Sequence, residues 1–529
     1  MDAVVGAIRD GILYIDLAGR IDSGNAQEVQ DEIIRLVEGR ENIPIVFDAE
    51  KLEYISSAGL RILLRMRKKN SDITITNVNP EVYEILDMTG FTQMLEVRKA
   101  YRRISVEGCE EIGHGSNGTL YRIDKDNVVK VYKNSDALPE IQHEREVSRL
   151  ALIMGIPTAI SYDVVRVGDS YGSVFELLNA RTFSDIIANE PDKLDWCVEE
   201  YIKMLRKIHS TEVSEGKLPD LRETVISWVE FVKDYLPEDQ WNKLMSLVKE
   251  VPADNHMIHG DYHTQNLMVQ NGEILLIDMD TLSVGHPIFE LASMFNSFVG
   301  FSELDHDAIL AFQGFDYDTA QAFWHKAMAL YLGTEEEDKI QSVVDKARIV
   351  GYTRMMRREI HRNGLETEEG RRRIAFWKEQ MGELLEKTDT LLFDLSELDI
   401  EAEKENLQIV LDFVDEQLSR VGCPVKAQMQ IAVAVEEIFI NIANYAYAPD
   451  KGRARVRVEV SDEPIVVTIT FIDQGMPYDP LAKEDPDITL PVEEREIGGL
   501  GIFLVKKTMD DVEYQYKDGQ NILRLKKNL

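Results

Sequence analysis

The first half of the sequence carries, in a fixed order, residue types that phosphoryl transfer requires. The segment EEIGHGSNGTLYRI, between two strand-like runs, contains three glycines: Gly113, Gly115 and Gly118. Lys130 follows in the strand-like NVVKVYK, and Glu144 and Glu146 follow in the helical EREVSRLALIMG. Transfer of a phosphoryl group needs a cover over the phosphates, a cation on them, a carboxylate for the acceptor hydroxyl, and metal ligands. The glycines and the lysine fit the first two of these requirements.

The other two requirements are met further along the chain. The segment IHGDYHTQNLMVQ contains Asp261 and Asn266, and GEILLIDMDT ends a strand-like run at Asp278. A lone lysine in a strand is usually solvated, and an HGD triplet alone is typical of a turn. The complete series in this order is much more specific, so we predict a phosphotransferase site that uses ATP and Mg²⁺.

Residues 104–365 resemble the aminoglycoside phosphotransferase and choline kinase branch of the protein-kinase-like fold. HGD stands where typical protein kinases have HRD, and IDMD stands where they have DFG. The resemblance implies a bilobal domain in which Asp261 is the catalytic base and Asn266 and Asp278 hold Mg²⁺. It also implies that the glycine-rich segment covers the nucleotide.

The same resemblance implies that Lys130 binds the phosphates and pairs with Glu146, with Glu144 as the alternative partner. The family phosphorylates small molecules, and some members modify proteins. The acceptor of this domain therefore stays open between a small molecule and a protein.

A second set of chemistry-bearing residues lies near the C-terminus. Glu437 and Asn441 are four residues apart in the helical VAVEEIFINIANYAY, so they share one helix face. Asp473 and Gly475 follow the strand-like VVTITFID, and the segment IGGLGIFLVKK places glycines before an apolar helix. An acid and an amide on one face can activate a hydroxyl and ligate Mg²⁺, and glycines let backbone amides approach phosphates. Each piece alone is ordinary, because E-x-x-x-N is common on solvated faces and D-x-G is common in turns.

Together these pieces resemble the anti-sigma-factor serine kinases of the GHKL ATPase superfamily, over residues 396–529. The resemblance implies a Bergerat-type α/β sandwich with Glu437 as the base and Asn441 as a ligand of both Mg²⁺ and nucleotide. It implies that Asp473 reads the adenine amino group. The glycines that it places along the nucleotide are Gly475, Gly499 and Gly501.

A third feature is the pair of serines in KLEYISSAGLRIL, where a strand-like run meets a helical one. A serine at this position is usually an N-cap. The surrounding residues 1–100 resemble the STAS domain of anti-anti-sigma factors, through LAGRID, IVFDAEKLEYISSAGLRIL and NVNPEVYEILDMTGF. The resemblance implies that Ser57 is a phospho-acceptor, and the family usually has Asp where Ser56 stands. A phosphate at a helix start would meet free amides and would change the surface that a partner contacts.

Length, composition and charge indicate how many domains carry these sites and which partners are excluded. The chain has 529 residues, 44% hydrophobic residues and a net charge of −36, which predict several packed domains and argue against nucleic acid or an anionic membrane as a direct partner. Three scattered cysteines without metal-ligand spacing indicate reduced thiols. The start MDAVVGAIRDG lacks a signal-peptide pattern, and no apolar run reaches about 18 residues. We therefore expect a cytoplasmic protein.

The elements that must position these residues divide the chain into an α/β and α+β multidomain protein. We predict a STAS domain at 1–100, a phosphotransferase-like domain at 104–365, a helical connector at 366–395 and an ATPase domain at 396–529. In the STAS domain the pattern predicts a hairpin turning at Asp10-Gly11 and a helix capped by Ser23.

The favoured interpretation is a bacterial partner-switching protein that joins a phospho-acceptor, a serine kinase and a phosphotransferase. The partners implied are anti-sigma-type or STAS-type proteins, in cis or in trans, and a sigma factor; a homodimer through the C-terminal domain stays open. Two alternatives also stay open. One is a nucleotide-sensing scaffold without catalysis, and the other is a small-molecule kinase regulated by the flanking modules.

Overall fold

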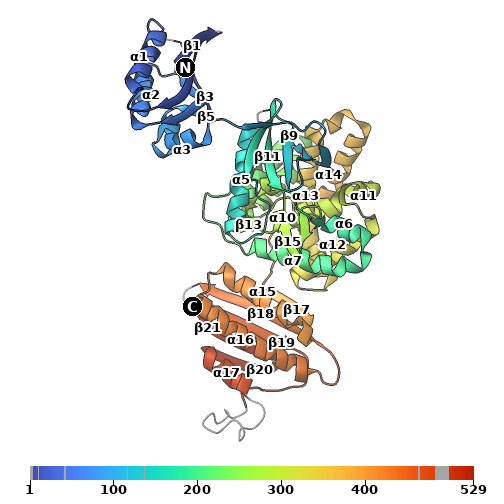
Figure 1. The fold of residues 1–529 in the computed structure, drawn as a ribbon. Coiled ribbons are helices and arrows are strands. Elements are labelled where there is room, and N and C mark those ends of the chain that lie inside the picture. Colours follow the sequence, from blue (N-terminus) through green and yellow to red (C-terminus); the bar gives the residue numbers. More distant parts are fainter. Residues whose placement is uncertain are drawn as a thin grey trace. The chain divides into compact units, whose positions relative to one another are not determined.

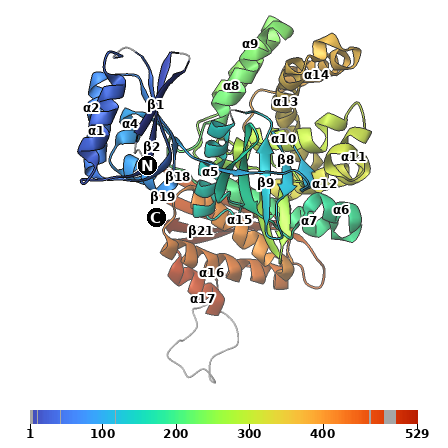
Figure 2. The ribbon, with the colours of Figure 1, turned by 45° about the horizontal axis from the view of Figure 1, so that its top comes forward.

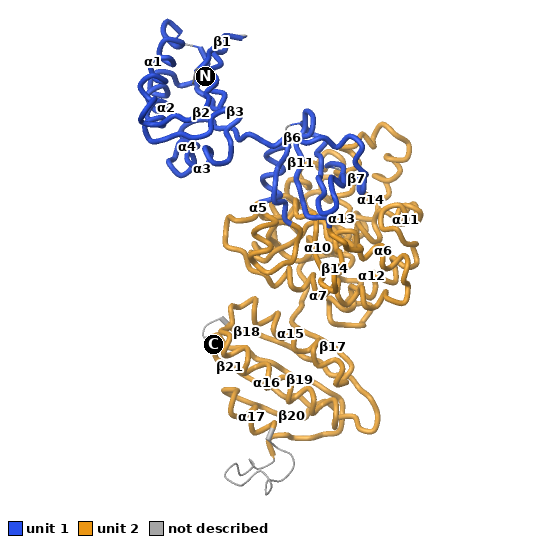
Figure 3. Tube along the Cα trace, in the orientation of Figure 1, with its two compact units in different colours: residues 1–145, 160–177 blue, residues 146–159, 178–529 orange. Residues whose placement is uncertain are grey.

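The computed structural model describes residues 4–9, 11–40, 43–115, 117–135, 137–462, 465–482 and 500–529. The chain divides into two compact units (Figure 3). The first unit comprises residues 1–145 and 160–177, and the second comprises residues 146–159 and 178–529. Helix α5 (Leu138–Ile153) runs across the division between them.

The first hundred residues form a five-stranded sheet with helices (Figure 1). Its strands, in spatial order, are β1 (Val4–Arg9), β2 (Ile12–Ile21), β3 (Ile45–Ile55), β4 (Ile73–Val78) and β5 (Glu96–Lys99). Its helices are α1 (Ala26–Val37), α2 (Ser57–Lys69), α3 (Pro80–Met88) and α4 (Phe91–Met94). β1 and β2 are antiparallel and the other neighbouring strands are parallel. The apolar residues of β2 and β3 alternate with polar ones and form a core with the helices.

Two local predictions can be compared with this domain. Arg9 pairs with Ile12, which confirms the hairpin, although Asp10 lies outside the described residues. The prediction of Ser23 as a helix cap is wrong, because α1 begins after Asn25. The Asn25 side chain does not cap the helix; its Oδ1 accepts from the Asp22 amide and its Nδ2 donates to the Arg20 carbonyl.

The rest of the first unit contains a six-stranded sheet. Its spatial order is β6 (Arg102–Ile104), β10 (Asp163–Val167), β11 (Ser170–Glu176), β9 (Asn127–Tyr132), β8 (Gly118–Arg122) and β7 (Glu110–His114). β7 and β8 form the hairpin that carries the glycine-rich segment. β9, the strand of Lys130, is a central strand between β8 and β11.

The second unit begins with a mainly helical region. Its longer helices are α6 (Phe183–Asn189), α7 (Leu194–His209), α8 (Leu221–Phe231), α9 (Glu238–Glu250), α10 (Ile288–Phe298), α11 (Asp307–Gln313), α12 (Tyr317–Leu332), α13 (Glu337–His361) and α14 (Glu368–Lys387). Short strands carry the motifs between α9 and α10: β13 (Met257–Ile258), β14 (Leu267–Gln270), β15 (Glu273–Leu276) and β16 (Ser283–Val284). Helix α10 is buried along its whole length, so it forms the centre of this region.

The segment 366–395 is more than a connector. It contains α14, which packs against α13 and α9. Ile374, Trp377 and Met381 of α14 are buried in the same core as α10. The apolar face of the helix places it in the helical region, whereas its many charged residues had suggested a solvated link.

The last part of the second unit is a five-stranded antiparallel sheet with helices. The strand order is β17 (Glu397–Glu401), β18 (Arg453–Asp462), β19 (Ile465–Asp473), β21 (Gln520–Asn528) and β20 (Asp511–Lys517). The helices are α15 (Leu407–Arg420), α16 (Val425–Asn441) and α17 (Leu500–Thr508). α16 and α17 lie side by side on one face of the sheet (Figure 2). They cover a core of alternating residues from β18 and β19, which is the two-layer arrangement that the sequence predicts.

Candidate functional site

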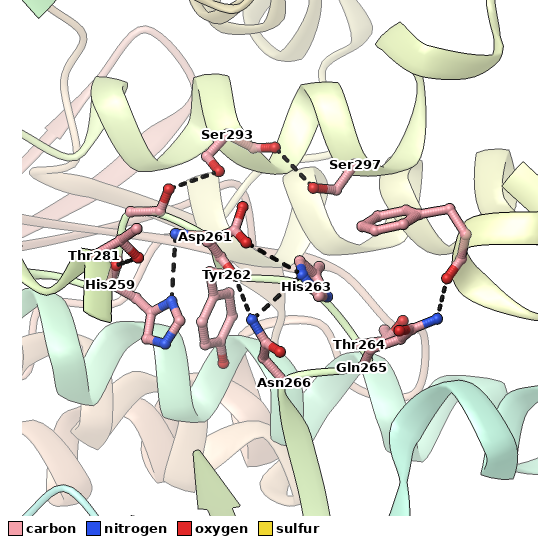
Figure 4. Close-up of polar contacts among 12 residues, drawn as sticks. His259, Asp261, Tyr262, His263, Thr264, Gln265, Asn266, Thr281, Ser293 and Ser297 are labelled. Carbon is pink, nitrogen blue, oxygen red and sulfur yellow. Dashed lines mark hydrogen bonds and ion pairs between the residues drawn. The ribbon is translucent and has the colours of Figure 1, made fainter. Parts of the chain in front are cut away.

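The loop between β13 and β14 holds the HGD motif in one conformation (Figure 4). Gly260 has φ +80°, and a Cβ there would lie 2.8 Å from the Thr281 carbonyl oxygen, so only glycine fits. The amides of His259 and Gly260 donate to the carboxylate of the fully buried Glu290, at 2.6 and 3.0 Å. These charge-assisted bonds fix the backbone immediately before Asp261.

Asp261 presents a carboxylate with strong positive neighbours. Its side chain is 38% exposed, so it is accessible to a ligand. Its Oδ2 lies 3.5 Å from Nε2 of His263, and its Oδ1 lies 3.4 Å from Nη2 of Arg354. Burial raises the pKa of Asp261, but the hydrogen bond and charge of His263 and the charges of Arg354 and His259 outweigh burial and hold this pKa well below its usual value. The group is therefore ionised and can accept a hydrogen bond from a hydroxyl.

Asn266 and Asp278, the predicted Mg²⁺ ligands, carry amide and carboxylate oxygens in neighbouring parts of the chain. Nδ2 of Asn266 donates to the Asp261 carbonyl at 3.0 Å, which leaves Oδ1 as the oxygen available to a cation. The Ile277 amide donates to the Asn266 carbonyl at 2.9 Å, which ties the residue before Asp278 to Asn266. Asp278 itself adopts a left-handed backbone conformation, φ +61°. Amide and carboxylate oxygens are ligands that Mg²⁺ prefers, usually together with substrate phosphates.

Lys130 lies in the first unit and forms an ion pair with a glutamate, as predicted. The glutamate is Glu144, and the prediction had preferred Glu146. Nζ of Lys130 lies 3.1 and 3.0 Å from the two carboxylate oxygens of Glu144, which is buried on α5. The hydroxyl of Tyr132 also donates to Glu144, at 2.5 Å. The choice of Glu146 as the partner of Lys130 is therefore wrong, because Glu146 is exposed. The two glutamates are two residues apart on one helix and point in different directions.

The three glycines of the hairpin differ in what they require. A Cβ at Gly118 would lie 2.4 Å from the Val131 carbonyl oxygen, so this position needs glycine for close strand packing. Gly113 and Gly115 have room for a Cβ. Lys133 donates to the Gly115 carbonyl at 2.9 Å, which holds the tip of the hairpin. The glycine-rich segment is thus a strand hairpin, and its role as a cover over a nucleotide stays a prediction.

Asp473 stands at the end of β19, in the second unit, with its carboxylate oriented by two donors. Its Oδ1 accepts from the Gly475 amide at 2.9 Å and from Nδ2 of Asn521 at 2.8 Å. Burial raises the pKa of Asp473, and these two hydrogen bonds partly offset that effect. A buried, oriented carboxylate at a strand end can read the amino group of a nucleobase. A Cβ at Gly475 would lie 2.3 Å from the Ala446 carbonyl oxygen, so a larger residue would displace this loop.

Glu437 and Asn441 lie on α16, both half-buried. α16 gives way after Asn441 to a π-helical turn at Ile442–Ala446, a feature that is frequent at functional sites. Gly501, at the start of α17, packs against Glu437: a Cβ there would lie 2.0 Å from the Glu437 carboxylate. The structure therefore brings Gly501 and Glu437 together. Gly499 lies outside the described residues.

The serine pair has two distinct roles at the start of α2. Ser56 is the N-cap, and its Oγ accepts from the Ala58 amide at 3.2 Å. Ser57 is the first helical residue and is exposed. Since Ser and Asp are both preferred N-caps, Ser56 can take the capping role of the aspartate that the STAS family usually has here. Gly59 is explained by close packing, because a Cβ there would lie 2.6 Å from Ile55 and 2.8 Å from Ile21.

Within the described ranges, no group of three or more His, Cys, Asp and Glu side chains is arranged to hold a metal ion. None of the helices in the described part of the chain is both long and apolar enough to cross a bilayer.

Three family models match the chain. They describe a STAS domain (residues 4–104), the phosphotransferase enzyme family (residues 108–323) and a histidine kinase-like ATPase domain (residues 400–527). The folds and sites thus define a multidomain protein of the kinase class, in which a STAS module is joined to two kinase-like modules.

Curated relatives cover the two ends of the chain. BtrV of Bordetella bronchiseptica, named as an anti-sigma factor antagonist, is 33% identical over 92 residues, which are 17% of this chain and 78% of BtrV. The serine-protein kinase RsbW of Bacillus cereus is 26% identical over 138 residues, which are 25% of this chain and 85% of RsbW. Through its first domain, this chain belongs to the STAS-domain family of anti-sigma factor antagonists.

Solved structures of aminoglycoside phosphotransferases are also similar. APH(4)-Ia has a TM-score of 0.37 at 13% identity, over 53% of this chain and 93% of that chain. ADP-bound APH(2'')-Ib has a TM-score of 0.36 at 14% identity, over 59% of this chain and 99% of that chain.

Several residues of these sites had not been singled out from the sequence. Asn521 orients Asp473 from 48 residues away, and Arg354 reaches Asp261 from 93 residues away. Glu290 clamps the HGD loop from α10. A glutamate within the apolar run PIFELASMF is the one signal among these three that a sequence offers, because a buried charge needs partners.

Proposed function

We propose that this chain is an ATP-dependent phosphotransferase of a partner-switching system. The observation that carries the proposal is the ordered HGD loop, in which an accessible, ionised Asp261 lies beside the candidate metal ligand Asn266. A scaffold that only senses nucleotide has no need of an accessible carboxylate held in this way. The loop therefore favours catalysis over the scaffold alternative.

The middle domain would work through its own side chains. Asp261 accepts a hydrogen bond from the acceptor hydroxyl, orients it and takes its proton as the new bond to phosphorus forms. Lys130, held by Glu144, would bind the phosphates of ATP. Asn266 and Asp278 would hold Mg²⁺, which supplies neutralisation of phosphate charge when it is bound.

The C-terminal domain would act on the STAS serine. Glu437 would accept the hydroxyl proton, Asn441 would hold Mg²⁺ and Asp473 would read adenine. Ser57 suits the role of acceptor because it is exposed while Ser56 caps the helix. After phosphorylation the helix start carries about −1.5 to −2 charges, which free helix amides tolerate and a closely packed partner does not. The implied partners are anti-sigma-type or STAS-type proteins.

Intact-mass analysis and phosphosite mapping after incubation with Mg-ATP test both assignments. Glu437→Gln should remove label from Ser57, whereas Asp261→Asn should leave it. Ser57→Ala is the control for the site. Loss of Ser57 label in Asp261→Asn alone would reassign the donor, and undiminished protein label in Ser57→Ala would refute the acceptor.

Calorimetry tests whether both pockets bind nucleotide. Wild type should bind two nucleotides per chain, and Asn441→Ala and Asp278→Ala should each bind fewer because each loses a metal ligand. A stoichiometry of one in wild type would contradict the two-pocket proposal.

A further inference from the structure

A row of arginines begins at the candidate catalytic carboxylate. Arg354 and Arg358 lie one turn apart on α13, and Arg362 follows directly after the helix. Nη1 of Arg354 donates to the Gly260 carbonyl at 2.9 Å, and its Nη2 lies 3.4 Å from Oδ1 of Asp261. Residues four apart share a helix face, so Arg358 continues the row away from Asp261. Arg354 thus positions the loop, and the next arginines lie beyond it.

Aromatic rings support these arginines. Two guanidinium groups of the row lie over aromatic rings, Arg354 at 5.6 Å from the centroid of Trp228 and Arg358 at 5.1 Å from that of Phe301. The neighbouring Arg357 lies 6.0 Å from the centroid of Phe231. A guanidinium that stacks on a ring keeps its N–H edge free to donate to an anion. Arg358 is therefore held in place by a ring contact that leaves its N–H donors free, whereas Arg354 uses its donors on the HGD loop.

The outer part of the row has no carboxylate within ion-pair distance in the described part of the chain. Among the residues that the structure describes, none forms an ion pair with Arg357, Arg358 or Arg362. Glu359, the acid between them, lies 3.8 Å from Arg373 of α14 instead. In a chain with a net charge of −36, a group of unpaired arginines beside a catalytic carboxylate is the opposite of the average surface.

Electrostatics add to the geometry. Burial lowers the pKa of Arg358, and the neighbouring charges of Arg362 and Arg354 lower it further, with Asp261 acting in the opposite direction. Mutual repulsion of this kind is relieved when an anion binds between the guanidinium groups. Two or more arginines arranged in this way are typical of phosphate and carboxylate recognition.

We infer that the acceptor of the middle domain is a small hydroxyl compound that carries a phosphate or carboxylate group. Its anionic group would bind Arg358 and Arg362, and its hydroxyl would lie against Asp261. Arg358 lies one helical turn, about 5.4 Å along the axis, beyond the arginine that contacts Asp261, so a small compound can be expected to contact both. This inference rests on the proposed function, because it names the substrate class of the same site.

The proposed transfer forms one bond to phosphorus and breaks another. The acceptor oxygen forms a bond to the γ-phosphorus of ATP, and the bond from that phosphorus to the β–γ bridging oxygen breaks. The hydroxyl proton passes to Asp261, and ADP leaves with the electron pair of the broken bond. The products are ADP and an acceptor with one more phosphate.

Charge also argues against two other classes of acceptor, polycationic aminoglycosides and acidic protein segments. A polycationic aminoglycoside would face the arginine row with like charges. An acidic protein segment would approach a chain whose net charge of −36 repels it, whereas a small anion is opposed far less. The structure thus favours a small anion over both.

Calorimetry on the full-length protein, with saturating Mg-ADP to occupy the nucleotide pockets, tests the inference. The probes are glycerol 3-phosphate and glycerate as the two anionic classes, glycerol as the neutral control and kanamycin as the cationic control, each to millimolar concentration. We expect at least one anion to bind more tightly than both controls. Arg358→Ala should weaken that binding about tenfold or more, since it removes a charge-assisted contact. Arg358→Lys, which keeps the charge, should lose less.

Arg372→Ala is the matched control, because Arg372 is an exposed arginine on α14. Its binding should equal that of wild type, and thermal unfolding of each variant checks folding. Equal or tighter binding of glycerol or kanamycin, no binding of either anion, or equal weakening in Arg358→Ala and Arg372→Ala would overturn the inference. So would transfer of phosphate by the Asp261 site to a protein side chain. Anion binding that depends on Arg358 but is never followed by transfer would support the anion site at the arginine row and refute the proposed catalysis.

Discussion

Substituting Ser56 and Ser57 one at a time should separate helix capping from phosphorylation. The Oγ of Ser56 accepts from the Ala58 amide at 3.2 Å, and the side chain of Ser57 is exposed. Ser56→Ala removes a cap, which costs about 1 kcal/mol of helix stability. Ser57→Ala removes no contact of this kind, so its cost should be within about 0.5 kcal/mol.

Amide hydrogen exchange of α2 peptides, measured in the full-length protein, reports these losses of helix stability at the helix itself. One kcal/mol corresponds to about fivefold faster exchange, because 1.4 kcal/mol is a factor of ten. Ser56→Ala should therefore show about fivefold faster exchange in the first turns of α2, and Ser56→Asp should restore the wild-type rate. Ser57→Ala should exchange like wild type.

Phosphorylation should depend on Ser57 and not on Ser56, which is the reverse of the dependence expected for helix stability. Ser57→Ala should lose the phosphoryl label, and Ser56→Ala should keep it. Two results would refute the reasoning: equal acceleration of exchange by Ser57→Ala and Ser56→Ala, or loss of label on Ser56→Ala with label retained on Ser57→Ala. Either would show that the two serines do not have the separate roles that their positions indicate.

Three further predictions follow from particular contacts. Glu144→Gln should weaken binding of a fluorescent ATP analogue about tenfold by removing a charged partner of the phosphate-binding lysine, whereas Glu146→Gln should leave binding unchanged. Burial lowers the pKa of His286 to about 4, so between pH 6.5 and pH 4 the unfolded chain binds a proton that the folded chain does not; the thermal midpoint should fall over this range, and less so in His286→Gln. Asn521→Ala should reduce the preference of the C-terminal pocket for ATP over GTP, measured by competition, because Asp473 loses a hydrogen bond that orients it.

The order and spacing of the motif residues allowed the fold classes to be predicted and the candidate sites to be proposed, because a complete series of motifs is much rarer than any one of them. The choice between Glu144 and Glu146 could not be made in this way. It depends on the rotation of α5 about its axis, which is set by tertiary packing against Lys130 and Tyr132. Arg354 could not be assigned to Asp261 for a similar reason, since local sequence carries no information about contacts made across 93 residues.

In the proposed function, a STAS acceptor and a serine kinase are parts of one chain, which changes how the two would meet. A flexible link would raise their effective concentration to about the millimolar range. The chain between them, however, is not a flexible link. Only two residues separate the end of β5 from the start of β6 at Arg102, and only nine separate α14 from β17 (Glu397–Glu401). Because a folded middle domain lies between them in the sequence, its geometry either permits contact between the STAS and C-terminal domains of one chain or prevents it. If Ser57 accepts phosphate as proposed, a mixture of active Ser57→Ala chains with Glu437→Gln chains separates the two routes: label on Ser57 of the Glu437→Gln chains would show transfer between copies.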